Sequence, residues 1–450
     1  MEERNNFAKG KVSTHILSIA GPMIVAQLIN VLYNVIDRIY IGRIPHTSTL
    51  AMGGLGICLP IISIVIAFAN LFGMGGAPLC SIARGRGNNK EAEKIMGNAF
   101  CLLVLFGIGL MIIGFLFKEK ILWLFGASSH TFKYANDYLT IYLLGTVFVL
   151  IGLGMNSFIN SQGFAKIGMM TVLIGAVLNI ILDPIFIFVL NMNVKGAALA
   201  KVLSQFVSAL WTIHFLTSDQ TILKLKKECM YLNPYYVKRI FSLGTAGFMI
   251  GMTNSIVSIV CNSTLQLYGG DLYIAIMTII NSIREVVQLP AQGFGNAAQP
   301  VLGYNYGAKE YKRVLSAIRF VTLLCFGTMF IIWVLITAFP QYFINIFTHD
   351  PHITKHAIIY IRLYFAGFFM QSLQICGQSV AVGLGKSKQA IFFSIFRKVI
   401  IVAPLTIILP RFIGIEGVFI SEAISNFIGG GACYITMWFT IGKSLKKEIS

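Results

Sequence analysis

The chain of 450 residues is 56% hydrophobic and 12% charged, with a mean hydropathy of +0.77. This composition excludes an ordinary soluble protein and is typical of an integral membrane protein. The net charge of +18 raises nucleic acid as a partner, but the basic residues are spread over short loops instead of forming one patch, which excludes that class.

Apolar runs along the chain predict an all-α polytopic membrane protein. A helix of about 20 apolar residues spans the hydrocarbon core of a bilayer. The predicted spans are 16–41, 52–80, 95–117, 136–161, 167–190, 194–217, 240–267, 272–303, 317–343, 357–380, 389–410 and 414–440. We therefore expect twelve transmembrane helices.

Basic residues gather in alternate loops between these spans. The densest clusters lie at 84–94, 224–239 and 309–319. Because Lys and Arg are enriched in cytoplasmic loops, this distribution predicts a multi-pass protein of the cell (inner) membrane with both termini cytoplasmic. The lipid bilayer is the expected partner, and no obligate protein partner is predicted.

The sequence is internally duplicated. Gly163 recurs 222 residues later as Gly385, and KGAALAKVLSQF at 195–206 matches EGVFISEAISNF at 416–427. Two copies with an even number of spans enter the membrane in the same orientation and are related by an axis along the membrane normal. The duplication therefore predicts two pseudo-symmetric six-helix lobes.

The predicted lobes are joined through the basic loop between the sixth and seventh spans. We expect an amino-terminal lobe at 1–217, a cytoplasmic linker loop at 218–239 and a carboxy-terminal lobe at 240–450.

An acid stands within the fifth span. Asp183 lies in the 19-residue run from Val172 to Leu190, which is otherwise broken only by Asn179. The spacing of four places both polar groups on one helix face, and Pro184 removes a backbone donor next to them. A polar and deformable spot at this depth is typical of a transport or proton pathway.

Other intramembrane polar residues differ between the two copies. The first copy also carries Asp37, whereas the second carries a possible polar site at Arg284, Glu285 and Asn262. We assign only Lys201 and Arg284 as bases that can face a central cavity, against three or four acids. The difference between the copies places the chemistry in the first lobe, and the excess of acids over bases favours a cationic cargo.

Cysteine and histidine patterns indicate no further chemistry. The eight cysteines show no CxxC spacing, so neither a disulfide framework nor a metal site is predicted. The sequence has no HExxH, no GxSxG and no intramembrane histidine cluster, so we do not expect an enzyme.

Four motifs together resemble the multidrug and toxic compound extrusion (MATE) family, especially its bacterial branch, over nearly the whole chain. They are Asp37 in the first span, LNIILDPIFIF at 178–188, KGAALAKVLSQ at 195–205 and QPVLGYNYGAK at 299–309. The resemblance implies a twelve-helix, two-lobed antiporter that expels drug-like, often cationic and amphipathic compounds in exchange for H+ or Na+, without another cofactor.

The resemblance also implies roles for individual residues. Asp37, Asn179 and Asp183 match the family's cation-binding positions in the amino-terminal lobe, and Tyr33 and Asn156 match polar positions nearby. Pro22 matches the proline at which the first helix bends. We treat these residues as the candidate site for the coupling ion and substrate, with Pro22 and Pro184 as candidate helix bends.

The chain departs from the family pattern at Lys201, where the family commonly has Thr. A lysine there can pair with Asp183 and occupy the site of a coupling ion, or it can face the lobe boundary. It aligns in the repeat with Glu422, and a pair between these two residues is a third choice.

A second departure concerns the carboxy-terminal lobe. Members of the Na+-coupled branch often carry acids in the seventh and tenth spans, whereas this chain has Asn254 and Asn262 in the seventh and three glutamines in the tenth. The sequence therefore gives no support for an ion site there. The alternative function is a flippase for a lipid-linked precursor or polysaccharide, of the same superfamily, which would need a basic cavity.

Overall fold

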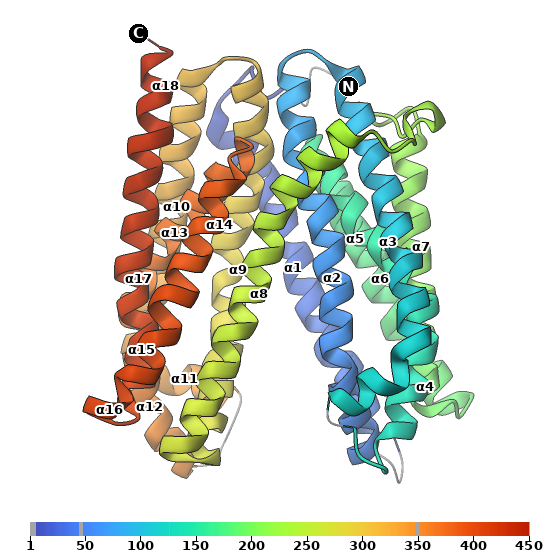
Figure 1. Cartoon of the computed structure of the whole chain (residues 1–450), viewed down its shortest axis with the longest axis vertical. Coiled ribbons are helices and arrows are strands. Elements are labelled where there is room, and N and C mark those ends of the chain that lie inside the picture. Colours follow the sequence, from blue (N-terminus) through green and yellow to red (C-terminus); the bar gives the residue numbers. More distant parts are fainter. Residues whose placement is uncertain (1–5, 45–47, 126, 347–350, 450) are drawn as a thin grey trace. The chain divides into compact units, whose positions relative to one another are not determined.

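The computed structural model describes residues 6–44, 48–125, 127–346 and 351–449, and its regular structure in these ranges is helical throughout (Figure 1). The α-helices are α1 (Val12–Gly42), α2 (Ser48–Gly85), α3 (Asn89–Leu124), α4 (Phe132–Leu144), α5 (Thr146–Ser161), α6 (Ala165–Pro184), α7 (Asn193–Thr217), α8 (Pro234–Gly269), α9 (Asp271–Gly307), α10 (Tyr311–Ala338), α11 (Pro340–Asn345), α12 (Pro351–Phe365), α13 (Gln371–Gly383), α14 (Ser387–Ile395), α15 (Ala403–Ile408), α16 (Pro410–Ile413), α17 (Glu416–Met437) and α18 (Lys443–Lys447).

The helices account for the predicted spans. Within the described ranges, ten helices are long and apolar enough to cross a membrane, and two bent pairs bring the number to twelve when each pair is one span. The pairs are α4 with α5, bent by 57°, and α12 with α13, bent by 40°. The predicted all-α membrane fold is confirmed.

Contacts divide the described chain into two compact units. Within the described residues, the first unit comprises Gly21–Gly244 with Asn6, and the second comprises Phe7–Ala20 and the residues from Thr245 onward. The division within the chain thus falls inside α8, after Gly244, and the first turns of α1 group with the second unit.

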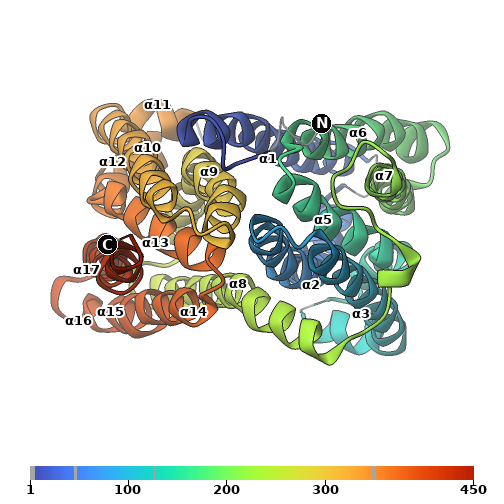
Figure 2. The ribbon, with the colours of Figure 1, turned by 90° about the horizontal axis from the view of Figure 1, so that it is seen from above.

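The first unit is built around α2. This helix packs against α5 and α3, while α7 packs against α5 and α6, and Figure 2 shows α2 beside α5 and α3. Small residues allow close approach: a Cβ on Gly244 of α8 would lie 1.7 Å from the Leu71 carbonyl oxygen of α2. No side chain larger than hydrogen fits at Gly244 without moving one of these helices.

The linker loop is bound to the first unit by buried side chains. Gln162, at the end of α5, is fully buried, and its Oε1 accepts hydrogen bonds from Thr221 Oγ1, Ile222 N and Leu223 N at 2.7–3.0 Å. Glu93 of α3 accepts from the backbone and side chain of the segment that follows, at Lys224 N and Lys226 Nζ. The hydrogen bond that Lys226 donates to the Glu93 carboxylate raises the pKa of Lys226.

Replacing Gln162 with Leu is expected to loosen this loop. The change leaves two backbone N–H groups, one of them on the fully buried Leu223, without their acceptor, at a cost of about 2 to 4 kcal/mol. The loop carries Lys224, Lys226 and Lys227, so limited trypsin digestion should cleave it several times faster in Gln162→Leu. Gln220→Leu, at an exposed position of the same loop, is the control. Equal cleavage rates for the two variants would contradict the anchoring role.

The second unit is built around α13. This helix packs against α17, α9 and α10, and α17 also contacts α12 and the segment that follows α14. The start of the chain is attached to this unit, because the Phe7 carbonyl accepts from Asn305 Nδ2 at 3.2 Å and Arg313 Nη2 at 2.7 Å. These bonds explain why Phe7–Ala20 groups with the second unit.

Turns recur at the spacing of the sequence repeat. Gly163, after α5, and Gly385, after α13, both have positive φ angles, of +90° and +74°, which favour glycine. The two bent pairs break at Gly145 and near Gly367, again 222 residues apart. The duplication seen in the sequence is therefore a duplication of backbone structure.

Candidate functional site

An acid and an amide are buried one turn apart on α6. Asp183 is fully buried and Asn179 is 2% exposed. Asn179 Nδ2 donates to Asp183 Oδ1 at 3.1 Å, as the four-residue spacing predicts. The bond occupies one carboxylate oxygen, and Asp183 Oδ2 has no hydrogen-bond partner among the described residues.

The backbone changes at the predicted proline. α6 ends at Pro184, and Ile185–Val189 continues as a π-helical segment. Because proline lacks an N–H group, it breaks the α-helical hydrogen-bond ladder beside Asp183. Pro22 lies inside α1, two residues after Ala20. Ala20 is the last residue of that helix that groups with the second unit, and the residues after it group with the first.

Lys201 of α7 pairs with Asp37 of α1. The distance from Lys201 Nζ to Asp37 Oδ2 is 3.4 Å, and the side chains are 12% and 3% exposed. The same Nζ lies 5.6 Å from the centre of the Tyr33 ring, one turn before Asp37, where it gains a cation–π contact. The two α1 residues thus offer the ammonium group a carboxylate and an aromatic face together.

The structure corrects the predicted partners of Lys201. The predicted partners are Asp183 and, as a third choice, Glu422, whereas Lys201 forms its ion pair with Asp37. Asp183 remains within electrostatic reach of both Asp37 and Lys201. Lys201 pairs with Asp37 and not with Asp183 for two reasons. Tyr33 and Asp37 share one face of α1 and bind the ammonium group together, and the Asp183 carboxylate already accepts a hydrogen bond from Asn179.

Several buried oxygens of the first unit are open acceptors. Asp37 Oδ1, Asp183 Oδ2, Asn179 Oδ1 and Asn156 Oδ1 have no hydrogen-bond partner within the described part of the chain. Asn156 uses its amide group to donate to the Gly168 carbonyl at 3.2 Å, which joins α5 to α6. Buried acceptors without donors are costly. A proton or a small cation satisfies such oxygens, and oxygen is the donor atom that hard cations prefer.

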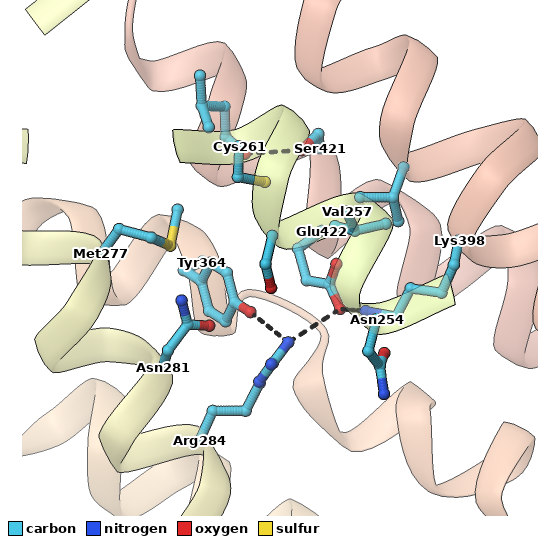
Figure 3. Close-up of a pocket in the computed structure, with 13 residues that line it drawn as sticks. Asn254, Val257, Cys261, Met277, Asn281, Arg284, Tyr364, Lys398, Ser421 and Glu422 are labelled. Carbon is cyan, nitrogen blue, oxygen red and sulfur yellow. Dashed lines mark hydrogen bonds and ion pairs between the residues drawn. The ribbon is translucent and has the colours of Figure 1, made fainter. Parts of the chain in front are cut away.

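The second unit contains a larger buried charge cluster, formed by Arg284, Arg397, Lys398 and Glu422 and called here the cationic cluster. Glu422 Oε1 lies 3.0 Å from Lys398 Nζ, 3.3 Å from Arg397 Nη1 and 3.9 Å from Arg284 Nη1. Figure 3 shows the Arg284 guanidinium between the Tyr364 hydroxyl and the Glu422 carboxylate. Arg284 Nη1 donates to Tyr364 Oη at 2.9 Å.

Backbone geometry brings two neighbouring bases to one acid. Arg397 and Lys398 lie in a π-helical segment, Phe396–Val402, that continues α14. In an α-helix, adjacent residues point about 100° apart, whereas the wider π turn reduces that angle. Both side chains thereby reach Glu422 of α17, and Arg397 Nη1 also donates to Asn426 Oδ1.

Most of the cationic cluster is not predicted from the sequence. The two bases predicted to face a central cavity, Lys201 and Arg284, do not include Arg397 and Lys398, which are buried with 3% and 5% exposure. The signal was present, since two charges interrupt the apolar run 389–410. Of the predicted second-lobe residues, Arg284 joins the cluster. Glu285 and Asn262 are exposed and do not line its pocket.

Two multidrug export proteins align with most of this chain. The multidrug export protein MepA of Staphylococcus aureus strain NCTC 8325 / PS 47 is 23% identical over 431 residues, which cover 94% of this chain and 93% of MepA. MepA of Staphylococcus haemolyticus strain JCSC1435 is 23% identical over 423 residues, covering 94% of this chain and 92% of that protein.

Solved structures share the fold. An outward-facing multidrug resistance MATE family transporter of the MOP superfamily superposes with a TM-score of 0.91 at 22% identity, covering 98% of both chains. A MOP superfamily transporter from Pyrococcus furiosus, described as having a binding pocket of reverse polarity that suggests a different function, has a TM-score of 0.91 at 21% identity and the same coverage.

A family model identifies the chain. The MatE model matches residues 22–185 and again residues 246–408. The two matches fall on the two copies of the repeat and contain Asp37, Asp183 and the paired bases of the second unit. The predicted resemblance to the MATE family is thereby confirmed, and the chain belongs to the MatE family.

Proposed function

We propose that the protein is a secondary active antiporter of the cell (inner) membrane, with both termini cytoplasmic, that exports cationic or amphipathic organic compounds, including drugs, in exchange for H+ or Na+. The observation that carries this proposal is the buried Asp183 carboxylate, one oxygen of which has no hydrogen-bond partner within the described ranges. Relatives named for multidrug export, aligned over nearly the whole chain, support the cargo class.

The chemistry follows from burial. A carboxylate in a region of low dielectric constant gains from binding a proton or a cation, because either one removes an uncompensated charge. Asp183 binds the coupling ion, Asn179 orients its carboxylate through the 3.1 Å hydrogen bond, and Asp37 with Lys201 sets the surrounding charge. Each elementary charge that crosses 100 mV supplies about 2.3 kcal/mol to drive export.

The test is exchange in proteoliposomes. A pH gradient or a Na+ gradient is imposed, a cationic dye is added, and both gradient collapse and dye movement are recorded against protein-free liposomes. Dye-dependent collapse of one gradient supports the proposal and identifies the coupling ion. If neither gradient drives dye movement, the antiport proposal fails.

Replacing Lys201 with Gln is expected to strengthen Na+ binding. Removal of the ammonium leaves Asp37 and Asp183 without the nearby positive charge, so the affinity for Na+ should rise ~10-fold. Thermal unfolding in NaCl against choline chloride at equal ionic strength reports this change. Lys195→Gln on the same helix, which breaks an exposed pair with Asp137, is the control. An unchanged response to Na+ would show that Lys201 does not compete with the ion.

A second candidate function, export of a lipid-linked precursor, would require a cationic binding site. The charge of the cationic cluster, three bases to one acid, is the observation that favours it. The antiport proposal remains the main one, because the Asp183 carboxylate of the first unit has an oxygen without a hydrogen-bond partner among the described residues, and such an oxygen can bind a cation.

A further inference from the structure

We propose that the cationic cluster of the second unit is a binding site for an anionic group, a carboxylate or a phosphate, carried by an organic molecule. The site itself stands on the geometry of the second unit. Its role in transport rests on the proposed antiport function.

The cationic cluster contains more bases than acids. Arg284, Arg397 and Lys398 converge on Glu422 Oε1, and among the described residues Glu422 is the only acid paired with any of the three. By formal charge, three bases against one acid, the cluster therefore has an excess of two positive charges. Unpaired charge is expensive in the interior of a membrane protein, and a bound anion compensates it.

Two guanidinium groups of the cluster have hydrogen-bond donors that no protein group accepts within the described residues. Buried Nε atoms of Arg284 and Arg397 have no acceptor in the described part of the chain. A guanidinium group that uses one Nη atom for a protein partner keeps its Nε–H edge for a second acceptor, and carboxylates and phosphates fit that edge. The protein thus satisfies only part of the hydrogen-bonding capacity that it has placed there.

The cationic cluster borders a pocket. Arg284 and Lys398 line a pocket together with the polar side chains of Asn254, Asn281 and Tyr364. The Arg284 side chain is 19% exposed, in contrast to 3% for Arg397. Figure 3 shows the amide groups of Asn254 and Asn281 around the charged groups. Eight of the thirteen residues that line the pocket are polar or charged, so it offers several hydrogen-bonding groups to a polar ligand.

Comparison with the first unit also indicates that the ligand of the cationic cluster is negatively charged. In the first unit the α7 residue Lys201 is a base and faces the acid Asp37. Its counterpart in the repeat, Glu422 of α17, is an acid and faces the bases of the cationic cluster. The charges are inverted between the two copies, so a site suited to cations in one copy becomes a site suited to anions in the other.

The alternative is that the cluster only stabilises the fold. Both roles require the bases to be buried, but only the ligand site predicts saturable stabilisation by added anions that depends on Arg284. Arg284 is the informative position, because its 3.9 Å approach to Glu422 is an ion pair without a hydrogen bond, so Glu422 keeps both hydrogen-bonded partners when Arg284 is replaced.

The experiment measures the unfolding temperature of the purified chain in neutral detergent. Inorganic phosphate and benzoate are titrated as soluble probes, with KCl at matched ionic strength as the reference. Phosphatidylglycerol is titrated as a lipid probe against phosphatidylcholine. The variants are Arg284→Gln and Lys398→Gln, and Arg411→Gln at an exposed position of the same unit is the matched control.

We expect phosphate, benzoate or phosphatidylglycerol to raise the unfolding temperature saturably, and the apparent affinity to fall at least ~10-fold in Arg284→Gln but not in Arg411→Gln. Stabilisation by the soluble anions identifies a free organic anion as the ligand, and stabilisation by phosphatidylglycerol alone identifies a lipid phosphate. The proposal is overturned if wild type responds to these probes no more than to KCl or phosphatidylcholine, or if Arg284→Gln binds as wild type does.

This outcome is independent of the antiport test. Anion binding without dye exchange would support the anion site and reject the antiport proposal. Dye exchange without anion binding would support the antiport proposal and reject the anion site.

Discussion

Asp183→Asn is expected to abolish ion-coupled export while leaving the fold intact. The amide has nearly the same shape as the carboxylate and keeps an oxygen that can accept the hydrogen bond from Asn179 Nδ2. It carries no charge, so the affinity for the coupling ion should fall ~10- to 100-fold, the loss expected for a buried charge-assisted interaction. In proteoliposomes, dye-dependent gradient collapse should decline to the level of protein-free liposomes.

A matched control separates this effect from a general loss of negative charge. Asp219 is an exposed acid of the linker loop that pairs with Lys224, and Asp219→Asn should export as wild type does. Asp37→Asn is a different case, because it leaves the buried Lys201 without its ion-pair partner and should reduce stability as well as transport. Full exchange by a well-folded Asp183→Asn would place the coupling site elsewhere.

Local patterns in the sequence were sufficient for the helices and for one half of the candidate site. Apolar runs predict the spans because a membrane helix must be long and continuously apolar. The Asn179–Asp183 hydrogen bond follows from helical spacing alone. The turn at Gly163 and its repeat at Gly385 could be aligned from sequence because their positive φ angles favour glycine.

Contacts between distant helices could not be predicted in the same way. Asp37 and Lys201 are 164 residues apart, and nothing local indicates that α1 presents Tyr33 and Asp37 to α7. The cationic cluster was missed for a related reason. Arg397 and Lys398 are adjacent, and adjacent residues of an α-helix face different sides, so the sequence gives no sign that a π-helical segment turns both toward Glu422.

Glu422→Gln is expected to destabilise the second unit more than any other single change in the cationic cluster. The substitution leaves Arg284, Arg397 and Lys398 without their shared carboxylate, and breaking a buried ion pair from one side costs ~3–5 kcal/mol. The unfolding temperature in neutral detergent should fall on the order of 10 °C. Glu416→Gln, at an exposed acid in the first turn of the same helix, is the control.

Two further measurements assign the cause of that loss. Inorganic phosphate should restore more stability to Glu422→Gln than to wild type, because an anion replaces the missing carboxylate. Adding Lys398→Gln to Glu422→Gln should cost less than the sum of the two single changes, since the second substitution removes one of the unpaired charges. If Glu422→Gln unfolds at the same temperature as Glu416→Gln, or if the two substitutions are additive, Glu422 does not neutralise the bases. The three cations then rely on other groups for their compensation.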